Sequence, residues 1–279
     1  NGYALVYADH RTILSSVFGV IRVEGVVAAN EWAQLQETDS DAALREGRTT
    51  LEDVIWYDST TANTTVAEGV RETQPVTFNV ATPVDMIGKA VTMYVEKTTI
   101  LSNSTVIGIA TNDDMNVINT TVESEDTVRD FLDGTGVTVD EDTAYYVNYG
   151  YCDNAEEAVA TINDYANTVY GTTNTNFALN GIEVEVIDNN DDGMAEYVLY
   201  TMETLSQVNR YSERDETLTF YVPDRVNGRL DLTASPATRD LADVVFADGV
   251  TVDTDDLILY VEYGGRTYVS LPEIVTGTM

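Results

Sequence analysis

Residues 181–200 read GIEVEVIDNNDDGMAEYVLY. Over 182–186, Ile, Val and Val alternate with two Glu, which is the pattern of a strand with one buried face. The following cluster of Asp, Asn and Gly is typical of a turn. A second apolar run at 197–200 comes directly after it. This stretch therefore predicts two strands joined by a polar turn. It indicates a β-type fold for the chain.

Short β-type segments recur on both sides of this stretch. Val, Thr and Tyr are frequent in them, and these residues favour strands. Gly264-Gly265 separates the last two segments and predicts a two-residue hairpin turn. Further strands are expected at 2–7, 18–28, 50–57, 75–80, 90–96, 105–110, 145–149, 217–222, 243–246, 257–263 and 267–271.

One segment has helical rather than strand spacing. Asn154 and Glu157 form the sequence pattern of a capping box, in which each side chain binds a backbone N–H at a helix start. Apolar residues then recur at intervals of three or four up to residue 166. We expect one helix over about 154–168.

These patterns predict a mainly β protein with three parts. Two β-rich modules of sandwich or barrel type are expected at 1–122 and 181–279, with a small α/β connector at 123–180 that holds the helix. The segments VTMYVE at 91–96 and LILYVE at 257–262 resemble each other, so the two modules could be an internal repeat.

The charge of the chain is strongly one-sided. Its 279 residues include 48 Asp and Glu but 14 Lys and Arg, which gives a formal net charge of −34. Such a field repels phosphate, so nucleic acid and anionic membrane are excluded as favourable partners. An acidic, polar β surface is typical of a secreted or cell-surface protein.

The composition also limits catalysis. A single cysteine and a single histidine exclude an internal disulfide framework, a cysteine-based zinc site and a multi-histidine metal site. No run of about 18 apolar residues predicts a membrane span. No nucleophile elbow or phosphate-binding glycine loop occurs. We therefore predict no enzymatic activity and no catalytic residue, with a hydrolase that uses two carboxylates as the least favoured alternative.

The turn at 188–196 carries the clearest chemical signal. Its oxygen-bearing residues stand at positions 1, 3, 5, 7 and 9, and Gly193 at position 6 permits a sharp bend. Position 12 is Leu199, so the twelve-residue EF-hand form is excluded, and a shorter nine-residue calcium loop between strands is expected. The candidate ligands are Asp188, Asn190, Asp192, the Met194 carbonyl and Glu196.

Two interpretations of this turn stay open. Four carboxylates in nine residues repel one another unless they are solvated or bridged by a cation, which favours calcium. Alternatively, the side chains of an Asn/Asp/Gly turn bind their own backbone. If calcium binds, we expect a Kd of roughly 0.1–1 mM, as in extracellular modules.

Several segments of the chain resemble large cell-surface proteins of gut Clostridia that carry S-layer homology domains. The similar segments are RTILSSVF at 11–18, GVVAANEWAQL at 25–35, LREG at 44–47, IGKAVTMYV at 87–95, YVNYG at 146–150 and the turn region 186–198. The S-layer homology domains themselves are absent from this sequence. The resemblance implies an extracellular surface protein, with wall attachment implied for the parent protein. Because the sequence starts at Asn1 without an initiator Met, we expect a mature or internal segment of such a protein.

Together, the resemblance and the lack of a catalytic pattern predict a structural role. We expect an extracellular protein that self-assembles with other copies into a cell-surface layer or filament. The strand at 2–7 is the expected site of strand addition to a neighbouring copy. The alternative is a surface adhesin or carbohydrate-binding module, in which Trp32 and Trp56 would stack on sugars.

Overall fold

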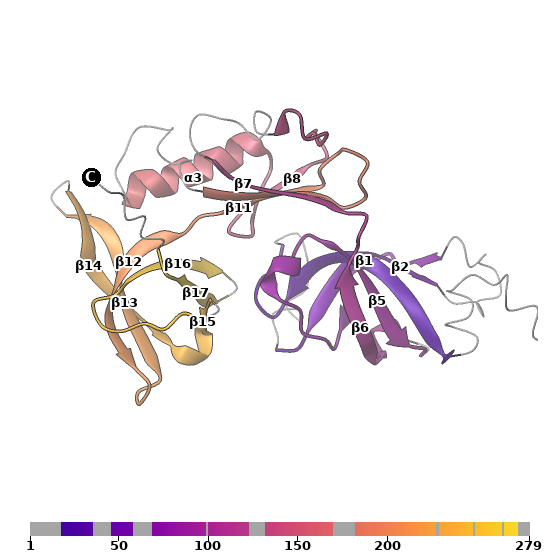
Figure 1. Ribbon diagram of the computed structural model, residues 1–279, viewed down its shortest axis with the longest axis horizontal. Helices are drawn as coiled ribbons and strands as arrows, with labels where there is room; N and C mark the ends of the chain where they lie inside the picture. The colour runs from indigo at the N-terminus through magenta and orange to yellow at the C-terminus, as the bar shows by residue number, and fades with distance from the viewer. Residues whose placement is uncertain are drawn as a thin grey trace, which may run out of the picture. The chain divides into compact units, whose positions relative to one another are not determined.

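The computed structural model describes residues 18–35, 46–57, 69–98, 100–122, 132–169, 182–226, 229–247, 249–263 and 265–272. It is mainly β, with three sheets and 54% of its residues in strands (Figure 1). Within these ranges one helix has seven or more residues. The predicted fold class is therefore confirmed. The strand expected at 2–7 lies outside the described residues.

The chain divides into two compact units that are interleaved in sequence. The first unit comprises Asn1–Val117 and Ile187–Glu196, and the second comprises Ile118–Val186 and Tyr197–Met279. The described part of the expected connector thus groups with the C-terminal strands. The turn at 188–196 groups with the first unit, although both strands beside it belong mostly to the second.

The first unit is built on a six-stranded sheet with the order β3-β2-β1-β5-β6, in which β4 also pairs with β2. All the pairs in this sheet are antiparallel. Two 3-10 helices accompany the strands, η3 at Val84–Met86 and η4 at Leu101–Asn103. The strands are β1 Val20–Asn30, β2 Thr49–Tyr57, β3 Val70–Arg71, β4 Val76–Phe78, β5 Ala90–Glu96 and β6 Val106–Thr111.

Alternation places the core of this unit on one face of the sheet. In β1, Ile21 and Val23 are buried, whereas Arg22 between them and Glu24 after them are half-buried. The strand ends at the fully buried Asn30, whose Oδ1 accepts hydrogen bonds from the backbone N–H groups of the second and third residues after it. This side chain holds a tight turn, after which the chain folds back: Gln34 pairs antiparallel with Ala29, and the Leu35 N–H donates to the Ala28 carbonyl at 2.9 Å.

The second unit contains a five-stranded sheet with the order β7-β10-β11-β8-β9. Its strands β8 and β11 are parallel neighbours, and α3 packs against β8 and β9 (Figure 1). The elements are β7 Asn116–Val122, β8 Ala144–Val147, β9 Gly150–Cys152, α3 Ala155–Val169, β10 Ile182–Asp188 and β11 Tyr197–Thr201.

The capping box predicts α3 correctly. The Asn154 Oδ1 accepts a hydrogen bond from the Glu157 backbone N–H at 2.9 Å. In return, the Glu157 carboxylate accepts one from the Asp153 N–H at 2.6 Å. The helix buries Ala158 and Ile162, which lie four residues apart on one face. The capping contacts explain why the helix begins at Ala155, within one residue of the predicted start.

The single strand expected at 145–149 is instead a hairpin. β8 ends at Val147 and β9 begins at Gly150, so Asn148 and Tyr149 form a two-residue turn. Both turn residues have positive φ, 47° and 63°, as the tight hairpin turn requires. The ring of Tyr149 lies 4.7 Å from that of Tyr263, which helps to hold a bulky residue in this unfavourable conformation.

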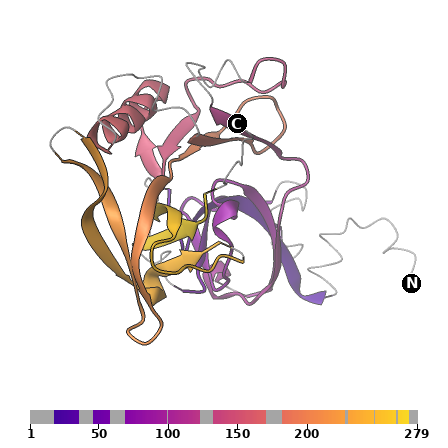
Figure 2. The same ribbon diagram turned by 60° about the vertical axis from the view of Figure 1, so that its left-hand side comes forward.

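The other sheet of the second unit has the order β14-β13-β12-β16-β17-β15, and its long β13–β14 hairpin is orange in Figure 2. Its core is a cluster around the fully buried Phe220 and Ile258. No helix in the described ranges is long and apolar enough to cross a membrane. The elements are β12 Thr204–Ser212, β13 Thr217–Val226, β14 Arg229–Asp240, the 3-10 helix η5 Leu241–Asp243, β15 Val244–Phe246, β16 Leu257–Tyr263 and β17 Arg266–Ser270.

Candidate functional site

The candidate calcium loop, residues 188–196, joins two neighbouring strands of one sheet. It begins at the last residue of β10 and ends one residue before β11. The Glu196 N–H donates to the Ile187 carbonyl at 2.9 Å and closes the loop at its base. The loop therefore lies between two strands, as the sequence predicts.

Asp188 organises the first half of the loop. Its side chain is fully buried. One carboxylate oxygen accepts hydrogen bonds from the N–H groups of Asn190 and Asp192 at 3.4 and 3.2 Å, and the other accepts from Gly193 at 2.9 Å. A buried carboxylate needs such donors because burial without partners is costly. The loop thus folds its backbone around this one group.

The next two predicted ligands, Asn190 and Asp192, each accept a hydrogen bond from the backbone N–H two residues further along the chain. The Asn190 Oδ1 accepts from the Asp192 N–H at 3.0 Å, and the Asp192 Oδ1 accepts from the Met194 N–H at 2.9 Å. Gly193 has a φ of 86°, which a glycine adopts without strain. The bend at position 6 that the motif needs is therefore present.

Glu196 closes the loop from its far end. Its carboxylate accepts hydrogen bonds from the Asn189 N–H at 2.7 Å and from the Asn190 Nδ2 at 3.1 Å. Burial raises the pKa of this carboxyl, and the negative charges of Asp188 and Asp192 raise it further, against the hydrogen bond from Asn189. A cation at the loop would offset this mutual repulsion.

The structure brings Asp188, Asn190, Asp192 and Glu196 into one hydrogen-bonded loop, with the partly exposed Met194 beside them. Their oxygens bind backbone and amide N–H groups of the same loop, which is the arrangement of the alternative turn interpretation. In the part of the chain that the structure describes, no three His, Cys, Asp or Glu side chains converge closely enough to hold a metal ion. The donor set nevertheless has the oxygen chemistry that calcium prefers, and Asp188 would be its buried ligand.

Asn189, a residue that sequence reasoning missed, fixes the loop to the first unit. Its Oδ1 accepts from the Ala90 N–H at 2.6 Å, and its Nδ2 donates to the Gly88 carbonyl at 2.9 Å. Ala90 is the first residue of β5 and Gly88 lies two residues before it, about a hundred residues earlier in the chain. Position 2 of the loop is not a ligand position, so no pattern in the sequence marks this residue.

Replacing Asn189 with alanine is expected to lower the free energy of unfolding of the first unit by about 2 kcal/mol, because two hydrogen bonds are lost at a half-buried site. Urea unfolding followed by tryptophan fluorescence measures this change, since both tryptophans lie in that unit. Asn103→Ala, at an exposed position of the same unit, is the matched control. Equal stability of the two variants would contradict the anchoring role.

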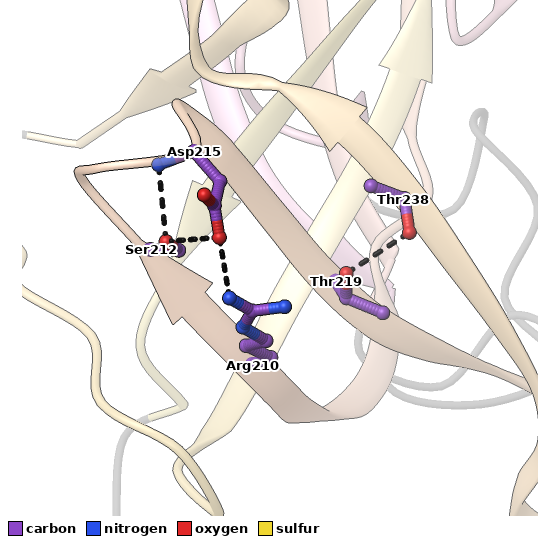
Figure 3. Close-up of polar contacts among 5 residues, drawn as sticks. All are labelled: Arg210, Ser212, Asp215, Thr219 and Thr238. Carbon is purple, nitrogen blue, oxygen red and sulfur yellow. Dashed lines mark hydrogen bonds and ion pairs between the residues drawn. The ribbon is translucent and has the colours of Figure 1, made fainter.

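Arg210, on β12, has polar partners close by in the chain. Arg210 forms an ion pair with Asp215, which also accepts a hydrogen bond from the Ser212 hydroxyl at 3.0 Å (Figure 3). Figure 3 also shows the bond between the hydroxyls of Thr219 and Thr238, which joins β13 to β14. The contacts of Asp215 stabilise the turn between β12 and β13, and the threonine pair stabilises the β13–β14 hairpin.

The single cysteine is buried, and the two tryptophans are half-buried. Burial raises the pKa of the Cys152 thiol, which disfavours the reactive thiolate. Trp56 is half-buried, and its indole N–H donates to Glu72 at 2.8 Å. Trp32 is also half-buried. His10 lies outside the described residues.

Comparison with known proteins assigns no family. No family model matches the chain, and no curated protein matches it significantly.

Proposed function

We propose that this chain is a structural extracellular protein that self-assembles into a bacterial cell-surface layer or filament. The observation that carries the proposal is a pair of uncharged strands at sheet edges. β6 is the last strand of the first sheet, and β7 is the last strand of the second. Neither strand contains a charged residue.

The lack of charge in this region contrasts with the rest of the sequence. Between residues 98 and 122, Asp113 and Asp114 are the only charged residues, whereas the whole chain carries a net charge of −34. An edge strand exposes backbone N–H and C=O groups that can pair with another chain. Proteins usually prevent such pairing with charges, prolines or very short edge strands.

The other sheet edges carry these protections. β3 has two residues, and β4, β9 and β15 have three each. β14 is long, but it contains Pro236 and four charged residues. Two unprotected edges per chain allow each copy to bind two neighbours, which is the minimum for a filament, whereas one edge would give only a dimer.

Calcium has a defined place in this proposal. Copies with a charge of −34 repel one another, and salt or a bound divalent cation reduces that repulsion. We propose that the loop at 188–196 binds calcium at the millimolar or submillimolar level found outside cells. Its Asn189 anchor would then connect ion binding to the start of β5, the strand that pairs with β6.

Negative-stain electron microscopy of the purified chain, with calcium at about ten times the expected Kd and again with chelator, tests the function. We expect filaments or sheets in calcium and mostly small particles in chelator. Magnesium at equal ionic strength is the control, because Mg²⁺ demands a stricter octahedral site. Monodisperse monomers in every condition would contradict the proposed function.

A further inference from the structure

We propose that β6 is the contact strand for a second copy of this chain, pairing antiparallel with the β6 of that copy. The inference rests on the proposed function and names the surface and the partner. Such a pair would be symmetric, since each copy presents the same strand, and it would join two six-stranded sheets into one.

The inner side of β6 is already fixed by its pairing with β5. Ile109 lies opposite Met93, which is fully buried, and Thr111 lies opposite Val91. This register holds the strand in an extended conformation. No other described strand pairs with β6, so its second edge remains available for hydrogen bonding.

A bulge gives this edge an exposed apolar side chain. Gly108 lies opposite Tyr94 and Val106 lies opposite Val95. Ile107 is therefore an extra residue in β6 that has no paired residue on β5. The Ile107 side chain is 57% exposed. Exposed isoleucine on an edge strand is unusual in a monomer, because it adds apolar surface next to unpaired backbone.

The surface around the bulge is open. A Cβ atom at Gly108 would have no atom within 4 Å, and Tyr94 next to it is 36% exposed. Ala110 and Thr111 are also exposed. We call Tyr94, Ile107, Gly108 and Ala110 the edge patch. It is an uncharged surface of aromatic and aliphatic groups on β6 and on the neighbouring residue of β5.

Charge identifies the occupant as a second copy. Over most of its sequence each copy is acidic, so contacts between two copies would place like charges together. Pairing of β6 with β6 avoids this, because neither strand carries a charge. A basic partner would instead bind the acidic parts of the surface, because the edge patch has no carboxylate to attract it. The uncharged edge is therefore best suited to another copy of itself.

The first test blocks the edge with charge. In Ile107→Lys/Ala110→Lys, and separately in Ile107→Glu/Ala110→Glu, symmetric pairing would bring like charges together. We expect sedimentation analysis to show at least a tenfold weaker first association step in both variants. Ser235→Lys on β14 is the control for charge alone, and it should associate like the wild type. Unchanged far-UV circular dichroism and melting temperature would show that the variants fold.

The second test measures proximity. A nitroxide at Ala110→Cys, in a Cys152→Ala background, should give a distance below about 30 Å between two copies, given about 3.4 Å per strand residue and about 4.8 Å between paired strands. Dilution with unlabelled protein should remove the signal.

The outcomes separate the two proposals. Assemblies with labels far apart, or with full association of both charged variants, would overturn the β6 contact and leave the proposed function intact. Dimers with labels close together but no larger particles in calcium would support the contact and contradict the proposed function. A wild-type chain that stays monomeric at high salt would overturn both.

Discussion

Replacing Phe220 with alanine is expected to lower the free energy of unfolding of the second unit by about 4 kcal/mol. Phe220 is fully buried on β13, and its ring lies 4.6 Å from that of Tyr260. The Arg239 guanidinium lies 5.6 Å from the centre of the same ring. The alanine variant loses the buried ring and leaves a cavity that rigid strands cannot close.

Urea unfolding measured by far-UV circular dichroism and by tryptophan fluorescence tests this prediction. The circular dichroism transition should move to lower urea, whereas the signal of Trp32 and Trp56, which lie in the first unit, should keep its midpoint. Phe220→Leu should cost about 1.5 kcal/mol, because much of the volume is retained. Leu257→Ala, at a position that is 45% exposed, should change stability by less than about 0.5 kcal/mol. A loss below about 1 kcal/mol for Phe220→Ala would contradict the assigned core.

Sequence reasoning located the strands whose apolar residues alternate. The strand expected at 18–28 is β1, and the alternation at 182–186 is β10. The hairpin turn at Gly264-Gly265 agrees with the pairing of Tyr263 with Arg266. These features depend on neighbours in sequence, so the local pattern contains the information that fixes them.

Strands with polar buried faces were not expected. In β12 the buried face consists of Thr204, Ser206 and Val208, so the usual apolar alternation is hidden. The Ser206 hydroxyl reaches the backbone carbonyl of Tyr221, which makes its burial favourable. β14 contains Pro236 and several charges, a composition that reads as a loop but is allowed in an edge strand. In both cases the partner strand, not the local sequence, decides the structure.

The same limit applies to the candidate site. The spacing of Asp, Asn and Gly identified the loop and its bend, because these depend on residues within one turn. The anchor at Asn189 depends on Gly88 and Ala90, which lie far away in the sequence. Likewise, the alternation at 105–110 predicts a strand, but only the sheet order places β6 at an edge.

Replacing Asp188 with alanine is expected to lower the free energy of unfolding of the first unit by about 3 kcal/mol in chelator. The buried carboxylate accepts hydrogen bonds from three backbone N–H groups, and alanine leaves all three without that acceptor. We also expect the variant to lose the stabilisation by calcium, about 1.4 kcal/mol at ten times the Kd in the wild type. Urea unfolding followed by tryptophan fluorescence, with and without calcium, measures both effects.

Two conservative variants separate the turn from the ion site. Asp188→Asn keeps an oxygen acceptor but removes the charge, so it should retain about half of the stability that alanine loses and still show no response to calcium. Asp191→Asn removes the same charge at an exposed position outside the ligand spacing, where asparagine tolerates the φ of 56°. It should respond to calcium like the wild type. If calcium stabilises Asp188→Asn as strongly as Asp191→Asn, the loop is a hydrogen-bonded turn and the metal must act elsewhere.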